Sequence, residues 1–483
     1  MTKSVVQFGL CLLVAVFSGG ILLLGVPLKW EIAFMAALGT SVSMLVTGSP
    51  KRVLLFVVSV TVPIYFGKAL VVSRGNGSVA NGAGINLTDV LALALLLLLL
   101  AKLAIRQIEI HFFPLTTIPA LAWLVLSSLS LLTARDGQLG LIQLMNMSKL
   151  LLFCWVIANS VRNEVDVTWV TTGVVLGVLF QALVGIYQGV TGHPLGLYFL
   201  TETSAVQQQQ LTEGLVYRVQ GTIGHPNSYA MYVTTGLPLA LAFLFSAPRT
   251  QWKYPAIAAL CLGCLALVFS LSRSAWVNSV VITSLVLALA VRRKRIGGRA
   301  AVLIAGTTSL VLLGLILLGP HIIRSRLTSS DLGSANSRIT QAQTALAMIK
   351  GHPWVGVGLN NYVLVSPHYG AADFVSDKPV VVHNAFLLIA AETGLVGLTA
   401  FLSLLAILLI QAWRIVNRAR TDTLWVAGVG VLSAFVALSV HSMVDYALLG
   451  SLQTITQFWL LAGLCAALIQ HIDHDRQDAR RVL

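Results

Sequence analysis

Two arginines stand where long apolar runs of the sequence end. Arg218 lies shortly before the run that begins near Pro226, and Arg273 lies in the tight turn Ser270-Leu271-Ser272-Arg273-Ser274 between two apolar runs. An ionisable side chain beside an apolar span is costly, which makes it a first candidate for function. A guanidinium stays charged in a partly dry site and offers a planar fork of donors to phosphate oxygens. The two arginines therefore suit a pyrophosphate, unless each only extends its charge to the membrane surface.

A histidine opens another apolar run. His383 is followed by Asn384 and comes directly after a long polar segment. A neutral imidazole can remove a proton from a hydroxyl group near pH 7. His383 is therefore a candidate base, and the alternative is a histidine that only bonds the backbone where a helix begins.

Further ionisable residues lie inside the apolar runs. His441 and Asp445 are four residues apart near the end of the next-to-last run, a spacing that puts both on one face of a helix. They form either a base with its orienting carboxylate or a polar pair that joins helices, and the second is favoured. Lys149 is expected to pair with a carboxylate or to reach the interface. Glu392 is about half a turn out of phase with His383 on a helix of ~3.6 residues per turn, which favours a packing or gating role.

The composition is that of a membrane protein. Of 483 residues, 57% are hydrophobic and 10% are charged, against roughly 25% charged in soluble proteins. Runs of about 20 apolar residues match the ~30 Å of hydrocarbon that a helix crosses. We expect an all-α polytopic protein, one integral membrane domain over residues 1–483 with about 12–14 transmembrane helices. Fourteen candidate spans lie near residues 5–26, 30–47, 53–72, 88–105, 114–133, 139–161, 167–190, 226–246, 254–271, 274–291, 300–319, 383–413, 423–446 and 449–471.

The basic residues report on orientation. The net charge is +14, but lysines and arginines sit between apolar runs rather than on one solvated face, which argues against a nucleic-acid binder. If successive spans cross the membrane in opposite directions, most basic residues fall on one side of the membrane, including the cluster 292–299. The positive-inside rule then places that side, with both termini, in the cytoplasm.

Two connections on the opposite, outer side are long enough to carry function. The loop 191–225 ends in glycines and Pro226, which predict an ordered turn leading into a helix. The long loop 320–382 has Ile339, Ala342, Leu346 and Ile349 at helical spacing. That pattern predicts an amphipathic helix on the membrane surface, with those residues as its apolar face and an end at Gly351-His352-Pro353.

Neither outer loop contains an Asp-x-Asp pair, the arrangement that holds a divalent metal in sugar-nucleotide enzymes of this topology. A metal-independent reaction is favoured, with arginines providing the electrostatic stabilisation. An outer-face reaction also has no access to ATP, and so its donor must be already activated and carried by a lipid.

The residues around His383 resemble a known family. His383-Asn384, nine residues, and then Gly394-Leu395-Val396-Gly397 match the H-N-x9-G-x-x-G signature of the bacterial O-antigen ligase and polymerase family. Upstream, Gly351-His352-Pro353-Trp354-Val355-Gly356-Val357-Gly358-Leu359-Asn360, preceded by Ser337-Arg338, is similar to that family's long periplasmic loop.

The arginine segments extend the resemblance. Arg218 with Gly221 and Pro226-Asn227, and the turn Ser272-Arg273-Ser274, are similar to the two arginine sites of the family. Together the similar segments cover residues 217–397, and outside them the resemblance is one of hydrophobic pattern only.

The resemblance implies an inverting, metal-independent glycosyltransferase of the bacterial inner membrane, without a cofactor. At the periplasmic face it would move a glycan en bloc from undecaprenyl pyrophosphate to an acceptor hydroxyl. Arg218 and Arg273 would bind the pyrophosphate and stabilise its departure, and His383 would activate or position the acceptor. Four further residues are candidates for substrate binding: Arg338, Asn384, His441 and Asp445.

Three hypotheses about the function remain. A ligase would use lipid A core as the acceptor, and a polymerase would use another lipid-linked repeat unit; both would also contact membrane lipids. A transporter or flippase is the alternative from another class. Transporters usually place polar sites at the membrane midplane within repeats, whereas the candidate charges gather at the outer boundary and no repeat is evident.

Overall fold

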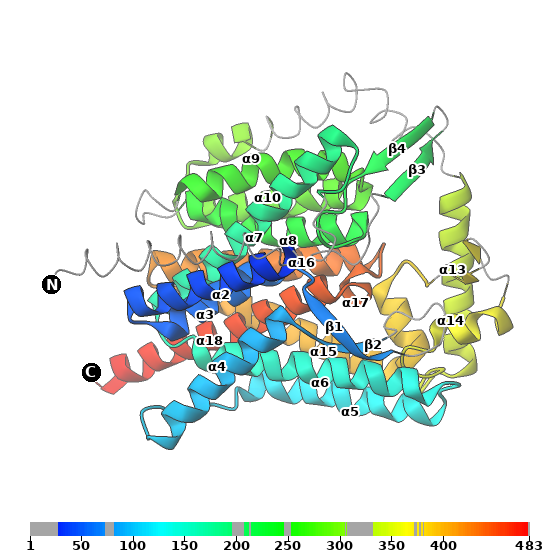
Figure 1. The fold of residues 1–483 in the computed structure, drawn as a ribbon, viewed down its shortest axis with the longest axis horizontal. Coiled ribbons are helices and arrows are strands. Elements are labelled where there is room, and N and C mark those ends of the chain that lie inside the picture. The colour runs from blue at the N-terminus through cyan, green and yellow to red at the C-terminus, as the bar shows by residue number, and fades with distance from the viewer. Residues whose placement is uncertain are drawn as a thin grey trace.

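The computed structural model is a bundle of long helices (Figure 1). It describes residues 28–72, 82–195, 207–211, 214–245, 253–304, 306, 332–370, 374–375, 378–379 and 381–481. The long helices are α2 (Leu28–Thr47), α3 (Pro50–Thr61), α4 (Leu87–Ala104), α5 (Pro114–Leu129), α6 (Gly137–Ser160), α7 (Glu164–Thr191), α8 (Pro226–Leu244), α9 (Lys253–Ser270), α10 (Arg273–Arg292), α13 (Leu332–Gly351), α15 (Ala385–Arg418), α16 (Asp422–Ser442) and α18 (Leu452–Arg481).

Short elements connect them. The short helices are η1 (Ser130–Leu132), α14 (Tyr362–Val365), η4 (Ser366–His368) and α17 (Ala447–Gly450). Three antiparallel hairpins pair β1 (Gly67–Val72) with β2 (Gly82–Asn86), β3 (Gln207–Leu211) with β4 (Gly214–Arg218), and β5 (Phe374–Val375) with β6 (Lys378–Pro379).

Among the described residues, nine helices are long and apolar enough to cross a membrane: α4, α5 with η1, α6, α7, α9, α10, α15, α16 and α18. The chain is therefore an all-α, polytopic membrane protein. Helix α8 is not among the nine and lies buried against α7, α9, α10 and α16. A helix enclosed by other helices rather than lipid can carry Tyr229, Tyr232 and Thr234 in its interior positions.

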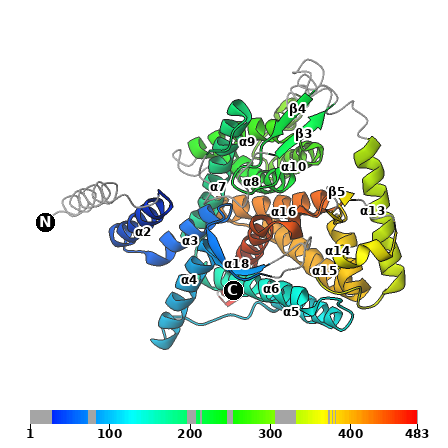
Figure 2. The same cartoon turned by 45° about the vertical axis from the view of Figure 1, so that its right-hand side comes forward.

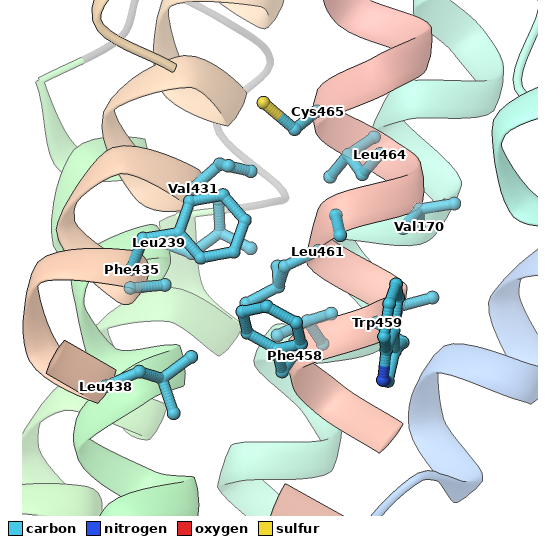
Figure 3. Packing of buried hydrophobic residues seen from close by; sticks show 14 of the residues in the cluster. Val170, Leu239, Val431, Phe435, Leu438, Phe458, Trp459, Leu461, Leu464 and Cys465 are labelled. Atoms are coloured by element: carbon cyan, nitrogen blue, oxygen red, sulfur yellow. The ribbon is translucent and has the colours of Figure 1, made fainter. Parts of the chain in front are cut away.

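Aromatic side chains fill the centre of the bundle between α16 and α18. The rings of Phe435 and Phe458 meet edge to face with centroids 5.8 Å apart, and Trp459 follows on the next position of α18 (Figure 3). Edge-to-face pairs of this kind add to the dispersion and burial that hold the core. Helix α18 is the most enclosed candidate span, with 94% of its apolar window buried.

One expected span is wrong in its second half. The run 53–72 was expected to form one helix, but α3 ends at Thr61 and residues 67–72 form a strand. Pro63 follows the helix, and a proline cannot donate the next helical hydrogen bond. The expected span at 5–26 lies outside the described residues, as does most of the span at 300–319.

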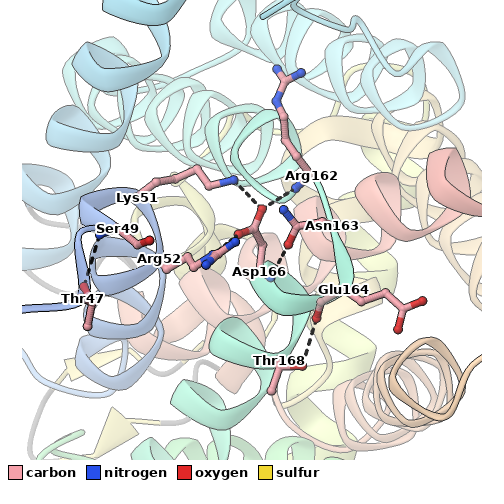
Figure 4. Close-up of polar contacts among 9 residues, drawn as sticks. All are labelled: Thr47, Ser49, Lys51, Arg52, Arg162, Asn163, Glu164, Asp166 and Thr168. Carbon is pink, nitrogen blue, oxygen red and sulfur yellow. Dashed lines mark hydrogen bonds and ion pairs between the residues drawn. The ribbon is translucent and has the colours of Figure 1, made fainter. Parts of the chain in front are cut away.

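Basic residues expected on one side of the membrane do gather at one end of the bundle, here called the basic end. The buried Asp166 carboxylate pairs with Lys51 and with Arg52 Nε at 3.2 Å, and accepts the Arg162 backbone N–H at 2.9 Å (Figure 4). Arg295 pairs with Asp422 at the start of α16. The first cluster ties α3 and the end of α6 to α7, and the second pair ties the end of α10 to α16.

At the other end, helix α15 is broken at Gly394. This residue has φ 69° and ψ −178°, and a Cβ there would lie 2.1 Å from the Trp354 carbonyl oxygen. The Leu395 N–H donates across the break to the Pro353 carbonyl at 2.7 Å. Only glycine tolerates both the backbone angle and the close approach.

At the break, the carbonyls of Ala391 and Glu392 accept hydrogen bonds from N–H groups of the preceding loop. The Val357 N–H donates to the Ala391 carbonyl at 2.9 Å, and the Gly358 N–H donates to the Glu392 carbonyl at 3.0 Å. Gly356 has φ 73°, and a Cβ there would lie 2.4 Å from backbone atoms of Glu392. The loop is thus hydrogen-bonded to the broken helix by its backbone, and buried carbonyls stay satisfied.

Helix α13 ends at Gly351, as expected, and runs across the ends of the spanning helices (Figure 1). Two residues of its expected apolar face, Ile339 and Leu346, are exposed, and their contact with a membrane surface stays a prediction. The buried side chains are Gln341, Thr344, Ala345 and Met348. They form a second face of the helix, which packs on α15 and on the loop that follows α13.

We expect Asp166→Ala to lower the unfolding midpoint of the purified protein in detergent. The change leaves Lys51 and Arg52 without their partner, and breaking a buried ion pair costs ~3 kcal/mol or more. Glu164→Ala is the matched control, because this carboxylate lies in the same first turn of α7 and points away from the cluster (Figure 4). Equal midpoints for the two variants would show that the cluster does not stabilise the fold.

We expect Gly394→Ala to destabilise the loop 353–358 and to expose it to protease. A Cβ at this position collides with the Trp354 carbonyl and strains the left-handed backbone, so the cost exceeds the ~1 kcal/mol of a tolerated glycine change. Gly137→Ala is the control, since a Cβ there meets nothing within 4 Å. Limited proteolysis that cleaves both variants equally would contradict the proposed role of the break.

Candidate functional site

The residues singled out from the sequence gather at the end of the bundle opposite the basic end. Hairpin β3–β4, helix α13 and the start of α15 all lie there (Figures 1 and 2). We call this region the site end. The side chains come from five separate stretches of the chain and are joined by a series of hydrogen bonds.

Arg218 is the last residue of β4 and is buried, with a relative exposure of 7%. Its Nε donates to the Ser270 carbonyl at 3.0 Å, and its Nη2 donates to Asn227 Oδ1 at 2.9 Å. The backbone next to Arg218 is bonded to the same end of α9, because the Val219 N–H donates to the Phe269 carbonyl. The guanidinium is therefore fixed between the start of α8 and the turn that contains Arg273.

The Asn227 side-chain amide joins Arg218 to Asp445 by hydrogen bonds. Its Nδ2 donates to Asp445 Oδ2 at 2.7 Å, and the other carboxylate oxygen accepts the Ala447 N–H at 2.8 Å. Asp445 is almost fully buried. A positive and a negative group thus share one amide, which compensates both charges in a poorly hydrated place.

Arg273 begins α10 and is half-buried. Both residues beside it belong to the network: Ser272 Oγ lies 3.2 Å from Ser274 Oγ, and Ser274 Oγ lies 3.2 Å from His441 Nε2. Arg218 binds the same turn through the Ser270 carbonyl. The structure therefore brings the two arginine segments together.

The expected pairing of His441 with Asp445 on one helix face is wrong. Helix α16 ends at Ser442, so Asp445 lies beyond it. His441 Nε2 contacts Ser274 of α10, while Asp445 contacts Asn227 of α8. Each residue joins α16 or its end to a neighbouring helix, as the favoured interpretation required, but they do so separately.

His383 is held by Gln341 of α13. Gln341 Oε1 lies 2.9 Å from His383 Nδ1 and also accepts the His383 backbone N–H at 3.3 Å. A backbone N–H only donates, so the shared atom is the amide oxygen and Nδ1 must carry the proton. The lone pair then resides on Nε2. Gln341 Nε2 donates in turn to Ser337 Oγ at 2.9 Å, which fixes the amide orientation.

The surroundings keep the His383 imidazole neutral. Burial lowers the pKa of His383, the Asp445 carboxylate and the Val381 backbone raise it, and the positive charge of Arg338 lowers it. Arg338 itself is exposed on α13. The net lowering of the pKa leaves the imidazole unprotonated, which is the form that accepts a proton.

Asn384 has both polar groups of its side chain bound within the protein. Its Oδ1 accepts the Leu387 N–H at 2.9 Å and caps α15, and its Nδ2 donates to the Met443 carbonyl at 2.9 Å. Such caps are favoured at a helix start. These bonds hold His383 beside the end of α16, and a contact between Asn384 and substrate stays a prediction.

Three residues of this region were missed in the sequence: His225, Gln341 and Tyr446. His225 lies directly before Pro226 at the start of α8. Burial lowers the pKa of His225, the Asp445 carboxylate raises it, and Arg218 and His383 lower it further. Gln341 lies on the buried face of α13 together with Thr344 and Ala345, three and four residues further along the helix. An uncharged residue between apolar ones gave no signal of that contact.

The arrangement combines two chemical capabilities. It has a neutral imidazole with a defined lone pair, and it has two arginine segments tied to the same set of hydrogen bonds. A neutral base in the same region as two arginines suits the transfer of a group from a phosphate leaving group to a hydroxyl. Lys149, also singled out, lies elsewhere and pairs with Asp89 at 2.9 Å.

Comparison with known proteins agrees with this chemistry. The family model described as O-antigen ligase matches residues 257–402, which include Arg273, Arg338 and His383 but neither Arg218 nor Asp445. A search of curated protein sequences gives no match. Over residues 257–402, this multi-pass membrane protein is therefore similar to the O-antigen ligase family.

Proposed function

We propose that the protein transfers a glycan en bloc from undecaprenyl pyrophosphate to a hydroxyl of lipid A core, at the periplasmic face of the bacterial inner membrane. The match of residues 257–402 to the O-antigen ligase family supports a membrane glycosyltransferase of ligase or polymerase type. The observation that carries the proposal is the His383 imidazole, fixed by Gln341 with its lone pair on Nε2, in the same region as both arginine segments.

The proposed step moves one proton and one glycosyl group. Nε2 of His383 takes the proton of the acceptor hydroxyl while that oxygen attacks the anomeric carbon of the glycan. The bond between that carbon and the pyrophosphate oxygen breaks, and undecaprenyl pyrophosphate leaves from the opposite face. The configuration at the anomeric carbon is therefore inverted.

Arg218 and Arg273 are assigned to the leaving group. Negative charge grows on the pyrophosphate as the glycosidic bond breaks, and guanidinium groups placed beforehand stabilise it most in a poorly hydrated site. The bonds from Arg218 to Ser270 and Asn227 orient its plane before substrate arrives. In this proposal the arginines provide the charge stabilisation without a metal.

A polymerase would use the same donor and the same step, with a second lipid-linked glycan as the acceptor. Gel analysis of surface polysaccharide from a deletion strain separates the two. Loss of a ligase leaves bare core with accumulated lipid-linked polymer. Core capped with a single repeat unit would instead show that a polymerase has been lost.

We expect His383→Ala to lower the transfer rate by about 100-fold or more, since a general base contributes roughly 10²–10⁴-fold. The assay uses purified protein with an undecaprenyl pyrophosphate glycan and lipid A core. His368→Ala is the control, because this histidine is exposed in η4 of the same loop. Transfer by His383→Ala at the rate of the control would rule out His383 as the base.

The dependence of the rate on pH provides a second test. Burial lowers the pKa of His383. We therefore expect the imidazole to stay unprotonated, and the transfer rate to stay constant, as the pH falls to the ordinary histidine pKa of about 6.5. Gln341→Glu keeps an oxygen at Nδ1 but adds a negative charge, which raises the pKa of His383. The acid limb of the rate profile should move to higher pH. An unchanged profile would contradict the assigned role of Gln341.

We expect Arg218→Lys and Arg273→Lys each to slow transfer by about ten-fold or more while the protein stays folded. Lysine keeps the charge but loses the planar fork that binds two phosphate oxygens together. Arg135→Lys is the control, since Arg135 is exposed and donates only to the nearby Leu364 carbonyl among the described residues. Equal transfer rates for the three variants would show that neither Arg218 nor Arg273 takes part in the reaction.

A further inference from the structure

A cavity of about 360 Å³ lies between α5, α6, α15, α17 and α18, with strand β2 along one side. The helices that surround it are side by side in both views of the bundle (Figures 1 and 2). The proposed catalytic step uses none of the residues that line this space. A cavity of this size accommodates a small ligand.

Polar side chains occupy one part of the cavity wall. Gln143, Asn146 and Lys149 line it from α6, and the buried Glu392 lines it from α15. Asn146 Nδ2 and Lys149 Nζ donate to carbonyls of β2, so these two residues also hold the strand beside the cavity. Donors and acceptors together within a membrane domain are costly, which favours a functional role.

Aromatic side chains form another part of the wall. The rings of Trp123 and Trp459 are stacked, with centroids 6.3 Å apart and an interplanar angle of 18°. Trp123 Nε1 is buried and has no hydrogen-bond partner among the described residues. The cavity therefore offers flat apolar surfaces close to several hydrogen-bonding groups.

Tyr446 contacts both the candidate base and a residue of the cavity wall. It packs edge to face with His383, with ring centroids 5.5 Å apart. Gly450 lines the cavity, and a Cβ added to it would approach the Tyr446 ring to 2.5 Å. The cavity therefore lies in the neighbourhood of the imidazole.

We propose that this cavity binds a sugar unit of the acceptor glycan, an inference that rests on the proposed transfer reaction. A sugar ring has apolar C–H faces that stack on indole and hydroxyl groups that bond to amides and carboxylates. A prenyl chain fits this wall poorly, since it would cover the Gln143 amide and the buried Trp123 Nε1 without offering either a hydrogen-bonding partner. The acceptor hydroxyl then lies on a neighbouring unit beside His383.

The test measures sugar binding apart from catalysis. Full-length His383→Ala protein in lipid nanodiscs is titrated with two fluorescently labelled saccharides: core oligosaccharide released by mild acid from lipid A core, and glycan released by mild acid from the lipid-linked donor. The two probes distinguish a core acceptor from a lipid-linked glycan acceptor. Transfer by wild-type protein is measured separately, so a failure of the proposed reaction is seen independently of binding.

Two changes at one position probe the cavity. Gln143→Trp fills it, and Gln143→Leu removes the hydrogen-bonding amide at similar volume. We expect binding of one saccharide to weaken by about ten-fold in Gln143→Trp and by a few-fold in Gln143→Leu. Met145→Trp is the matched control, because Met145 lies two residues away on α6 and is exposed at 56%. We expect this control to bind as the parent does.

Three results would overturn the proposal. One is equal affinity in Gln143→Trp and Met145→Trp, and another is no saccharide binding by protein whose wild-type form catalyses transfer. The third uses a photoreactive polyprenyl phosphate. If Gln143→Trp abolished its crosslinking and left saccharide binding unchanged, the cavity would be a lipid-chain site.

Discussion

The break in α15 at Gly394 is the constraint on which the site end depends. A continuous helix would keep the Ala391 and Glu392 carbonyls for its own hydrogen bonds and leave the loop before it unattached. Because the helix breaks, Val357 and Gly358 bond to those carbonyls. The loop and the first turns of α15 then form one unit, with His383 at its start.

A second consequence of the break concerns Glu392. Its Oε1 accepts the Tyr362 N–H at 3.1 Å, so its carboxylate holds the loop beside α15. The same side chain lines the cavity proposed for the acceptor. Helix α13 completes the unit, because Tyr362 donates its hydroxyl to the Gln341 carbonyl while the Gln341 side chain holds His383. The backbone of the loop and the orientation of the imidazole are thus coupled.

The sequence predicted the kind of fold, and the residues that it singled out as a site lie in one region of the structure. Apolar run length is dictated by the membrane, and so α4 to α7, α9, α10, α15, α16 and α18 appear close to their expected positions. Arg218, Arg273 and His383 were found because an ionisable residue beside an apolar span is rare. Glu392, expected in a packing or gating role, bonds the Tyr362 backbone, as its spacing half a turn out of phase with His383 allows.

What the sequence did not predict depends on contacts between distant segments. The face of α13 with Gln341, Thr344, Ala345 and Met348 is buried by α15 and by the loop, and the amphipathic pattern gave no sign of this second contact. Uncharged residues such as Gln341 and Asn227 carry no compositional signal, and their roles follow only from the partners that folding brings near them. The separate contacts of His441 and Asp445 likewise follow from where α16 ends.

The proposed reaction requires pyrophosphate to bind at the site end, close to both arginine segments. An experimental structure of the wild-type protein in nanodiscs with bound undecaprenyl pyrophosphate would locate it. We expect pyrophosphate density within hydrogen-bonding distance of Arg218 and Arg273, on the same side of the bundle as His383. Density at the basic end, beside Lys51 and Arg162, would contradict it.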